Sequence, residues 1–254
     1  MPNVVACYKW VIDEADVRVA PDLSVDASRA KMKISDYDRN AIQAAVEAAA
    51  ALGGAAYGLS YGDERVGKSV KDALSRGLDE LVWVSDPEAG AADAARTAAV
   101  LAAAAEDLPE VGLVVCADGS SDQFARQTAP RMAALLGWPV VSAVSALSFE
   151  GDSLVAERQA DDGVEVVEVA LPAVVAVLPE AAEAPIPGLR QIMQAGKKPQ
   201  RETAVAELGA TVEPRLAVTA QRGYAMDRKN IVWDAADEGW LESLTDALRK
   251  EGVL

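Results

Sequence analysis

Histidine is absent from all 254 residues of the chain. This absence excludes Ser-His-Asp and Cys-His catalysis, histidine metal ligands and histidine proton shuttles. Only two cysteines occur, Cys7 and Cys116, and their wide separation forms no CxxC, zinc or disulfide pattern. We expect both to be small buried strand residues. We therefore predict neither catalytic residues nor a metal site, and expect any chemistry to come from a cofactor.

Basic residues are scarce. The chain has 24 lysines and arginines but 40 aspartates and glutamates, which gives a net charge of −16. Such a chain repels phosphate backbones, so nucleic acid and anionic membrane surfaces are poor partners. No apolar run approaches the roughly 20 residues of a membrane span, and membrane insertion is not expected. The first residues lack a basic region followed by a long apolar stretch, so we expect no secretory signal and a cytoplasmic location.

Short apolar runs alternate with amphipathic, alanine-rich stretches, which is typical of an α/β fold with a mostly parallel sheet covered by helices. The predicted strands are Val4–Lys9, Ala56–Tyr61, Glu80–Val84, Leu113–Cys116 and Val140–Val144. The predicted helices begin after Ser35, near Asp63, near Ala91 and after Asp122.

Two of these helices carry specific signals. Ser35 and Asp38 have the spacing of a capping box, and Gly53-Gly54 is expected to end that helix. In the helix after Asp122, Met132, Leu135 and Leu136 are expected to face the core.

In the second half of the chain, from about Ser142, the pattern changes to short, valine-rich segments. An Asp-Gly pair between Leu154–Gln159 and Val164–Val169 predicts a hairpin, and we expect an antiparallel extension over about residues 142–178, closed by Leu171–Val177. Prolines within 179–187 predict an exposed loop. We therefore divide the chain into an α/β domain, residues 1–200, and a C-terminal linker and helical arm, residues 201–254. The arm helix packs either on another subunit or back on its own domain.

A candidate anion site follows the strand Leu113–Cys116. The Gly/Ser/Asp loop Asp118–Asp122 leads into a helix whose first turn is expected to offer Arg126, Gln127 and Thr128. Free N–H groups and the positive dipole end of a helix attract phosphate, and Arg126 would add a charge-assisted contact. An ordinary helix cap by Ser121 or Asp122 also accounts for the pattern, so both interpretations stay open.

Other loops are expected at the same edge of the sheet, because ligands of open α/β folds bind beyond the carboxyl ends of the strands. These are Cys7-Tyr8-Lys9, Tyr61-Gly62-Asp63 and the residues around Ser35. The dinucleotide fingerprint GxGxxG after the first strand and the Walker GxxxxGK[ST] motif are both absent, so a standard NAD domain and a P-loop ATPase are not supported.

Taken in order, these segments resemble the beta subunit of electron transfer flavoproteins, most closely its Fix-type branch. The matching pieces span about residues 4–200 and are Cys7-Tyr8-Lys9, Lys33–Asp38 with Asn40-Ala41-Ile42, Leu74–Leu81, Asp118–Asp122, Glu157-Arg158, Leu171–Val175, Ile192-Met193 and Lys197-Lys198-Pro199. The resemblance implies a Rossmann-like fold of the adenine-nucleotide-alpha-hydrolase-like type. It also implies an electron carrier rather than an enzyme, working as a heterodimer with an alpha subunit.

The resemblance further implies an FAD shared with the alpha subunit, and AMP or a second FAD in the beta-subunit site. A second FAD would go with flavin-based electron bifurcation. The implied cofactor-binding residues are Cys7, Ser35, Tyr61, Ala117, Asp118, Gly119, Ser120, Ser121, Asp122, Arg126, Gln127 and Thr128. Departures from the common family pattern at Ser35, Asp36 and Phe124 leave the choice between AMP and FAD open.

The family also uses a recognition loop, which maps here to about residues 179–198. Its anchor, Leu189, would dock on an acyl-CoA-type dehydrogenase or a Fix-type quinone oxidoreductase. The alternative for this residue is a leucine packed on its own domain. A stand-alone adenine-nucleotide-binding signalling module is the rival function, although it would need neither the antiparallel extension nor the arm.

Overall fold

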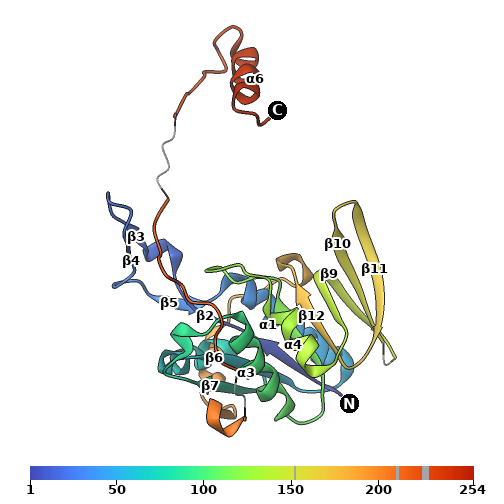
Figure 1. Ribbon diagram of the computed structural model, residues 1–254. Helices are drawn as coiled ribbons and strands as arrows, with labels where there is room; N and C mark the ends of the chain where they lie inside the picture. Colours follow the sequence, from blue (N-terminus) through green and yellow to red (C-terminus); the bar gives the residue numbers. More distant parts are fainter. Residues whose placement is uncertain (152, 210–211, 225–228) are drawn as a thin grey trace.

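The computed structural model describes residues 1–151, 153–209, 212–224 and 229–254. Its centre is a sheet with the strand order β11-β10-β9-β12-β8-β1-β6-β7-β13 (Figure 1). These strands are β1 (Asn3–Cys7), β6 (Ala56–Gly62), β7 (Glu80–Ser85), β8 (Val111–Ala117), β9 (Val140–Glu150), β10 (Ser153–Ala160), β11 (Gly163–Ala170), β12 (Ala173–Val177) and β13 (Gln200–Ala204). The α/β fold class with a mostly parallel sheet is therefore confirmed.

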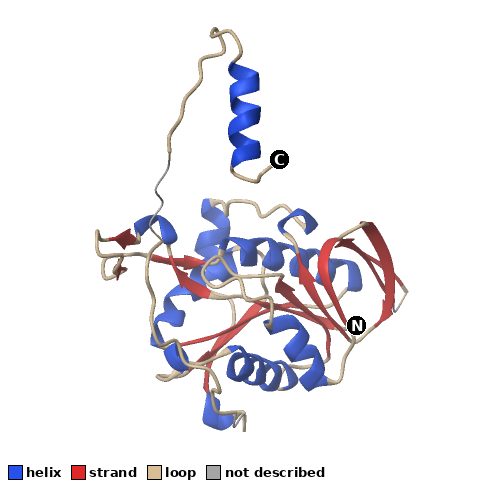
Figure 2. Cartoon of the chain, turned by 45° about the horizontal axis from the view of Figure 1, so that its top comes forward, coloured by secondary structure: helices blue, strands red, loops and turns tan. Residues whose placement is uncertain are grey.

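Helices cover both faces of this sheet (Figure 2). They are α1 (Asp36–Leu52), α2 (Val70–Ser75), α3 (Ala94–Glu106), α4 (Thr128–Leu136) and α5 (Leu189–Ala195), and α6 (Trp240–Lys250) follows near the C-terminus. Short 3-10 helices occupy Glu14–Asp16, Glu64–Ser69, Ala89–Ala91, Pro179–Ala181 and Val205–Glu207. Two small antiparallel ribbons pair β2 (Trp10–Ile12) with β5 (Met32–Ile34) and β3 (Arg18–Val19) with β4 (Val25–Asp26).

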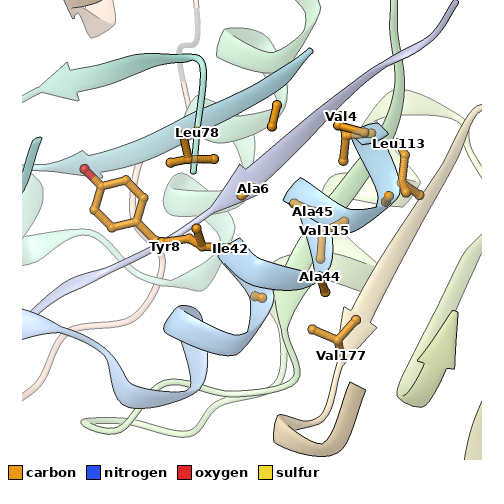
Figure 3. Close-up of a cluster of buried hydrophobic side chains, with 14 of the residues drawn as sticks. Val4, Ala6, Tyr8, Ile42, Ala44, Ala45, Leu78, Leu113, Val115 and Val177 are labelled. Carbon is orange, nitrogen blue, oxygen red and sulfur yellow. The ribbon is translucent and has the colours of Figure 1, made fainter. Parts of the chain in front are cut away.

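Two cores form, one on each face of the sheet, because alternate residues of the central strands point to opposite sides. Val4 and Ala6 of β1 pack against α1, whereas Val5 and Cys7 face α3 and α4. Figure 3 shows Ile42 and the small alanines of α1 lying directly on the first of these surfaces. The nearly continuous apolar sequence of β1 and β8 follows from burial on both sides.

The end of α1 agrees with the sequence prediction, whereas its beginning does not. Gly53 adopts a left-handed conformation, φ 70°, and its N–H donates to the carbonyl of Ala49. Ser35 does precede the helix, but its side chain makes no cap hydrogen bond. The predicted capping box is wrong because the Asp38 carboxylate instead accepts the N–H of Lys9 from the end of β1, at 2.7 Å.

The prediction of an antiparallel extension is correct for β9–β11 but wrong for β12. β10 and β11 form the predicted hairpin, and the second half of β9 pairs antiparallel with β10. However, β12, which corresponds to the predicted Leu171–Val177, runs parallel to β8 and β9. All five of its residues are buried, and such a strand suits the centre of a parallel sheet rather than a solvated hairpin.

The C-terminal region begins later than predicted. β13 pairs parallel with β7, so the boundary proposed at residue 200 would cut a strand of the sheet. Helix α6 forms as expected, has no buried residue and stands apart from the sheet in both views (Figures 1 and 2). It is therefore not folded back on its own domain. Residues 152, 210–211 and 225–228, which fall within the predicted extension and arm, lie outside the described residues.

Candidate functional site

The carboxyl ends of β1 and β8 define the candidate site. From β1 the chain continues to β6 and β7 on one side, and it later returns to β8 and β12 on the other. β1 and β8 are therefore adjacent parallel strands at the point where the strand order reverses. Open α/β sheets bind ligands in the crevice at this switch point.

Two contacts close the loops around this crevice. Lys9, just after β1, forms an ion pair with Asp122 at 2.6 Å. The Ser121 N–H donates to Ser35 Oγ at 3.2 Å, which joins the loop after β8 to the start of α1. Burial raises the pKa of Asp122, but hydrogen bonds from Lys9 and Ser120 outweigh that effect and lower it. Three predicted site residues, Ser35, Ser121 and Asp122, are therefore brought together.

The loop Asp118–Asp122 is held from within by Asp118. This buried carboxylate accepts the Ala143 N–H at 3.2 Å, and its other oxygen lies 2.8 Å from Arg126 Nε. The Arg126 guanidinium also lies over the Phe124 ring, 4.8 Å from its centroid. Gly119 is required beneath that ring, because a Cβ there would lie 2.4 Å from Phe124 Cδ2.

Arg126 is not in the first turn of a helix, contrary to the sequence prediction. Phe124 and Arg126 both have left-handed backbones, with φ 47° and 55°, and these conformations cannot continue into an α-helix. Helix α4 therefore begins at Thr128 and has Gln127 as its N-cap.

The start of α4 has no side-chain cap. Gln127 makes no side-chain cap hydrogen bond, and its amide oxygen accepts from Arg131 Nε at 3.0 Å instead. Pro130, in the first turn, has no N–H, so Thr128 and Ala129 supply the first amide donors. Neither of the predicted capping residues, Ser121 and Asp122, caps this helix, which rules out the ordinary-cap interpretation for them.

A cavity of about 460 Å³ lies beside this loop. Its lining combines predicted site residues with ones that sequence reasoning missed, namely Glu14, Asp36, Tyr37, Asn40, Ser120, Ser121, Phe124 and Pro179. Ser121 Oγ is buried without a hydrogen-bond partner among the described residues. The Tyr37 and Phe124 rings lie with their centroids 5.4 Å apart and are tilted by 52°. The sequence signal for this wall was one aromatic residue in the first turn of α1 and one in the loop after β8.

Tyr61 lies on a neighbouring strand, in a separate polar cluster. Its hydroxyl donates to Asp86 at 2.6 Å and accepts from Arg96 Nε at 3.3 Å. Burial, together with the hydrogen bond to ionised Asp86, raises the pKa of Tyr61 to about 12. Arg96 also pairs with Asp86 at 3.0 Å, so the cluster ties the ends of β6 and β7 to α3.

The Cys7 side chain does not reach the crevice. Its sulfur lies 3.9 Å from the Met132 sulfur within the core on the α3 and α4 side. Hydrogen bonding with Cys116, together with burial, raises the pKa of the Cys7 thiol. Both cysteines are free and buried, as predicted. The Cys7 side chain thus belongs to the core, and Ala117, at the end of β8, packs partly buried against the core on the α1 face.

Leu189 is the first residue of α5 and is 75% exposed, so it is not packed on its own domain. Ile186 and Met193 are also exposed and flank it. Helix α5 rests on α2. Just after α5, Lys198 Nζ donates to the carbonyls of Leu74 in α2 and of Leu78 shortly beyond it. The segment thus presents an apolar surface from a braced support.

This geometry defines a doubly wound α/β protein with a crevice at its switch point. The family model of the electron transfer flavoprotein domain matches residues 22–208. The chain therefore belongs to the electron transfer flavoprotein family, whose members are flavin-associated electron carriers.

Within residues 1–151, 153–209, 212–224 and 229–254, none of the helices combines the length and the apolar character that crossing a membrane requires. In the same ranges, no three side chains of histidine, cysteine, aspartate or glutamate gather as metal ligands would.

Proposed function

We propose that this chain is the beta subunit of an electron transfer flavoprotein, closest to the Fix-type branch. It would form a heterodimer with an alpha subunit and pass electrons between a flavin dehydrogenase and a downstream acceptor. The observation that carries this proposal is α6, whose Leu241, Leu244 and Leu248 fall on one side of a helix with no buried residue. An apolar helix face without a place on its own domain is suited to a partner subunit.

The chain's own nucleotide would bind at the crevice between β1 and β8. The uncapped start of α4 supplies amide donors for a phosphate, and the small residues Gly119 and Ser120 permit close approach. Arg126 is exposed at the same loop and would add a second contact once it turns from Asp118. The adjoining cavity, with its Tyr37 and Phe124 wall, supports a ligand that carries a planar ring.

The flavin supplies the redox chemistry when it is bound, and the protein contributes placement, burial and electrostatics. AMP and a second FAD both agree with the residues at the β1–β8 crevice, and bifurcation would require the FAD. Exposed Leu189 would dock on the partner dehydrogenase or quinone oxidoreductase. A cytoplasmic location remains part of this proposal.

The test is co-expression with a candidate alpha subunit, followed by counting the nucleotides in the purified complex. We expect a heterodimer with a flavin spectrum that contains either one FAD and one AMP or two FADs. Full FAD binding and dehydrogenase-coupled electron transfer by the isolated chain would contradict the proposal.

A matched pair of variants separates assembly from docking. Leu244→Glu places a charge on the apolar face of α6 and should abolish co-purification of the alpha subunit. Leu189→Ala, on the other exposed apolar surface, should leave co-purification intact.

A further inference from the structure

Asp93, which precedes α3, uses its two carboxylate oxygens for different segments of the chain. One oxygen caps α3 by accepting the N–H groups of Ala95 and Arg96 at 3.0 and 2.9 Å. The other accepts the N–H groups of Arg215 and Leu216 at 2.8 and 3.2 Å. These last two residues lie more than a hundred positions further along, in the segment that leads to α6. We call residues 212–224 the arm base.

A second contact holds the far end of the arm base. The Gly223 N–H donates to the Leu23 carbonyl at 2.8 Å, beside the β3–β4 ribbon (Figure 1). A Cβ at Gly223 would lie 2.2 Å from Val19 Cγ1, so the backbone passes directly over that side chain. The arm base is therefore attached to the folded domain near both of its ends.

Most side chains of the arm base are nevertheless exposed. Leu216 is 71% exposed and Val218 is 82% exposed, although both are apolar. The arm base thus contacts the domain mainly through its backbone and leaves these two apolar side chains exposed.

We propose that Asp93 is a positioning residue that anchors the arm base, so that the arm leaves the domain in one direction and offers Leu216 and Val218 to an apolar surface of the partner subunit. This inference rests on the proposed heterodimer. An anchored segment loses less conformational entropy on association than a free one, so the anchor should speed assembly.

The charge state of Asp93 agrees with this role. The N–H groups of Arg96 and Arg215 lower the pKa of Asp93, which keeps the carboxylate ionised at neutral pH. A charged acceptor forms stronger hydrogen bonds with backbone N–H groups than a neutral one does. The additional contact between Arg96 and Glu213, at 3.9 Å with Glu213 largely exposed, contributes little by comparison.

Limited trypsin digestion of the isolated chain tests the anchor. Arg215 and Arg222 are exposed cleavage sites within the arm base. Asp93→Ser keeps one oxygen for capping α3 but loses the oxygen that holds the arm, and Asp93→Asn replaces that oxygen with an amide nitrogen that cannot accept. Both variants should be cleaved at these arginines at least about fivefold faster than the parent chain, because local release precedes proteolysis.

Glu213→Gln is the matched control, since it removes the longer ion pair and leaves Asp93 unchanged; its cleavage should stay within about twofold of the parent. Far-UV circular dichroism identifies a variant that has not folded, and the other Asp93 variant then decides the outcome. Parent-like cleavage in a folded Asp93 variant would overturn the anchor.

Assembly is measured separately, as the association rate of each folded variant with the alpha subunit. We expect Asp93→Ser and Asp93→Asn to associate at least about threefold more slowly than the parent, and Glu213→Gln to match the parent. Faster cleavage with an unchanged association rate would overturn the role in assembly. A parent chain that binds no alpha subunit would instead overturn the proposed function and the partner assigned here, while cleavage still decides the anchor.

Discussion

Asp38 provides a quantitative test of burial next to the candidate site. Its side chain lies beneath the loop after β1 and accepts the Lys9 N–H at 2.7 Å. Burial raises the pKa of Asp38 from 3.8 to about 7, against the opposing effects of the Lys9 hydrogen bond and charge. The negative charge of Asp122 raises this pKa slightly further.

The sign of the pH dependence follows from this pKa. Between pH 3.8 and about 7, the folded protein holds a proton on Asp38 that the unfolded chain has released. Raising the pH through this window therefore lowers the free energy of unfolding. Integrating the difference in bound protons between about pH 5 and pH 8 gives a loss on the order of 2.5 kcal/mol.

The variant Asp38→Asn isolates this contribution. Its amide is neutral at every pH, and the amide oxygen can still accept the Lys9 N–H. We expect the difference in unfolding free energy, variant minus parent, to rise by about 2.5 kcal/mol between about pH 5 and pH 8, measured by urea unfolding. Other titrating groups cancel in this difference.

Asp22→Asn is the control. Hydrogen bonds from the Ser24 side chain and N–H lower the pKa of this exposed carboxylate, so it remains ionised over the same range. Its difference from the parent should not vary with pH. A constant difference for Asp38→Asn as well would mean that this carboxyl is ionised in the folded protein, and would refute the burial argument.

Three further predictions concern docking, nucleotide binding and the core. Leu189→Ala should slow reduction by the partner dehydrogenase at least about tenfold in stopped-flow experiments, because truncating an interface anchor commonly costs ~2 kcal/mol or more. Dithionite reduction and melting temperature should stay unchanged, and equal losses in both reductions would indicate a damaged flavin site instead. Arg126→Glu removes a guanidinium and places a second carboxylate beside Asp118, so retention of AMP or FAD through dialysis should fall about tenfold; undiminished retention would exclude a contact with Arg126. Leu113→Ala, in the buried centre of β8, should lower the free energy of unfolding by about 2–5 kcal/mol, whereas Leu135→Ala should cost less than about 1 kcal/mol. Similar losses in urea unfolding would contradict this assignment of the core.

The sequence by itself determined the elements whose signals are local. The apolar run of β1, the helical spacing of Ile42, Ala45 and Ala49 in α1, and the left-handed Gly53 at its end all depend on residues within a few positions of one another. The Asp-Gly turn specified the β10–β11 hairpin in the same way. Because strand and helix periods are properties of the local backbone, the α/β class could be predicted without any long-range contact.

Helix faces and strand partners were decided by the tertiary structure. Leu135 has helical spacing with Met132, yet it is 55% exposed because α4 turns its other side to the sheet. β12 pairs in parallel between β8 and β9, although the neighbouring hairpin favoured an antiparallel interpretation. Strand pairing joins residues far apart in the sequence, and no local pattern encodes the partner.

The details of the site also came only from the tertiary structure. The Asp38 carboxylate binds the Lys9 N–H instead of completing a cap, and Arg126 turns to Asp118 before α4 begins. Asp93 joins α3 to a segment more than a hundred residues away. In each case a short side chain satisfies whichever partner the packed chain brings within hydrogen-bond distance. The residue types and their loops follow from the sequence, whereas their partners follow from how the chain is packed.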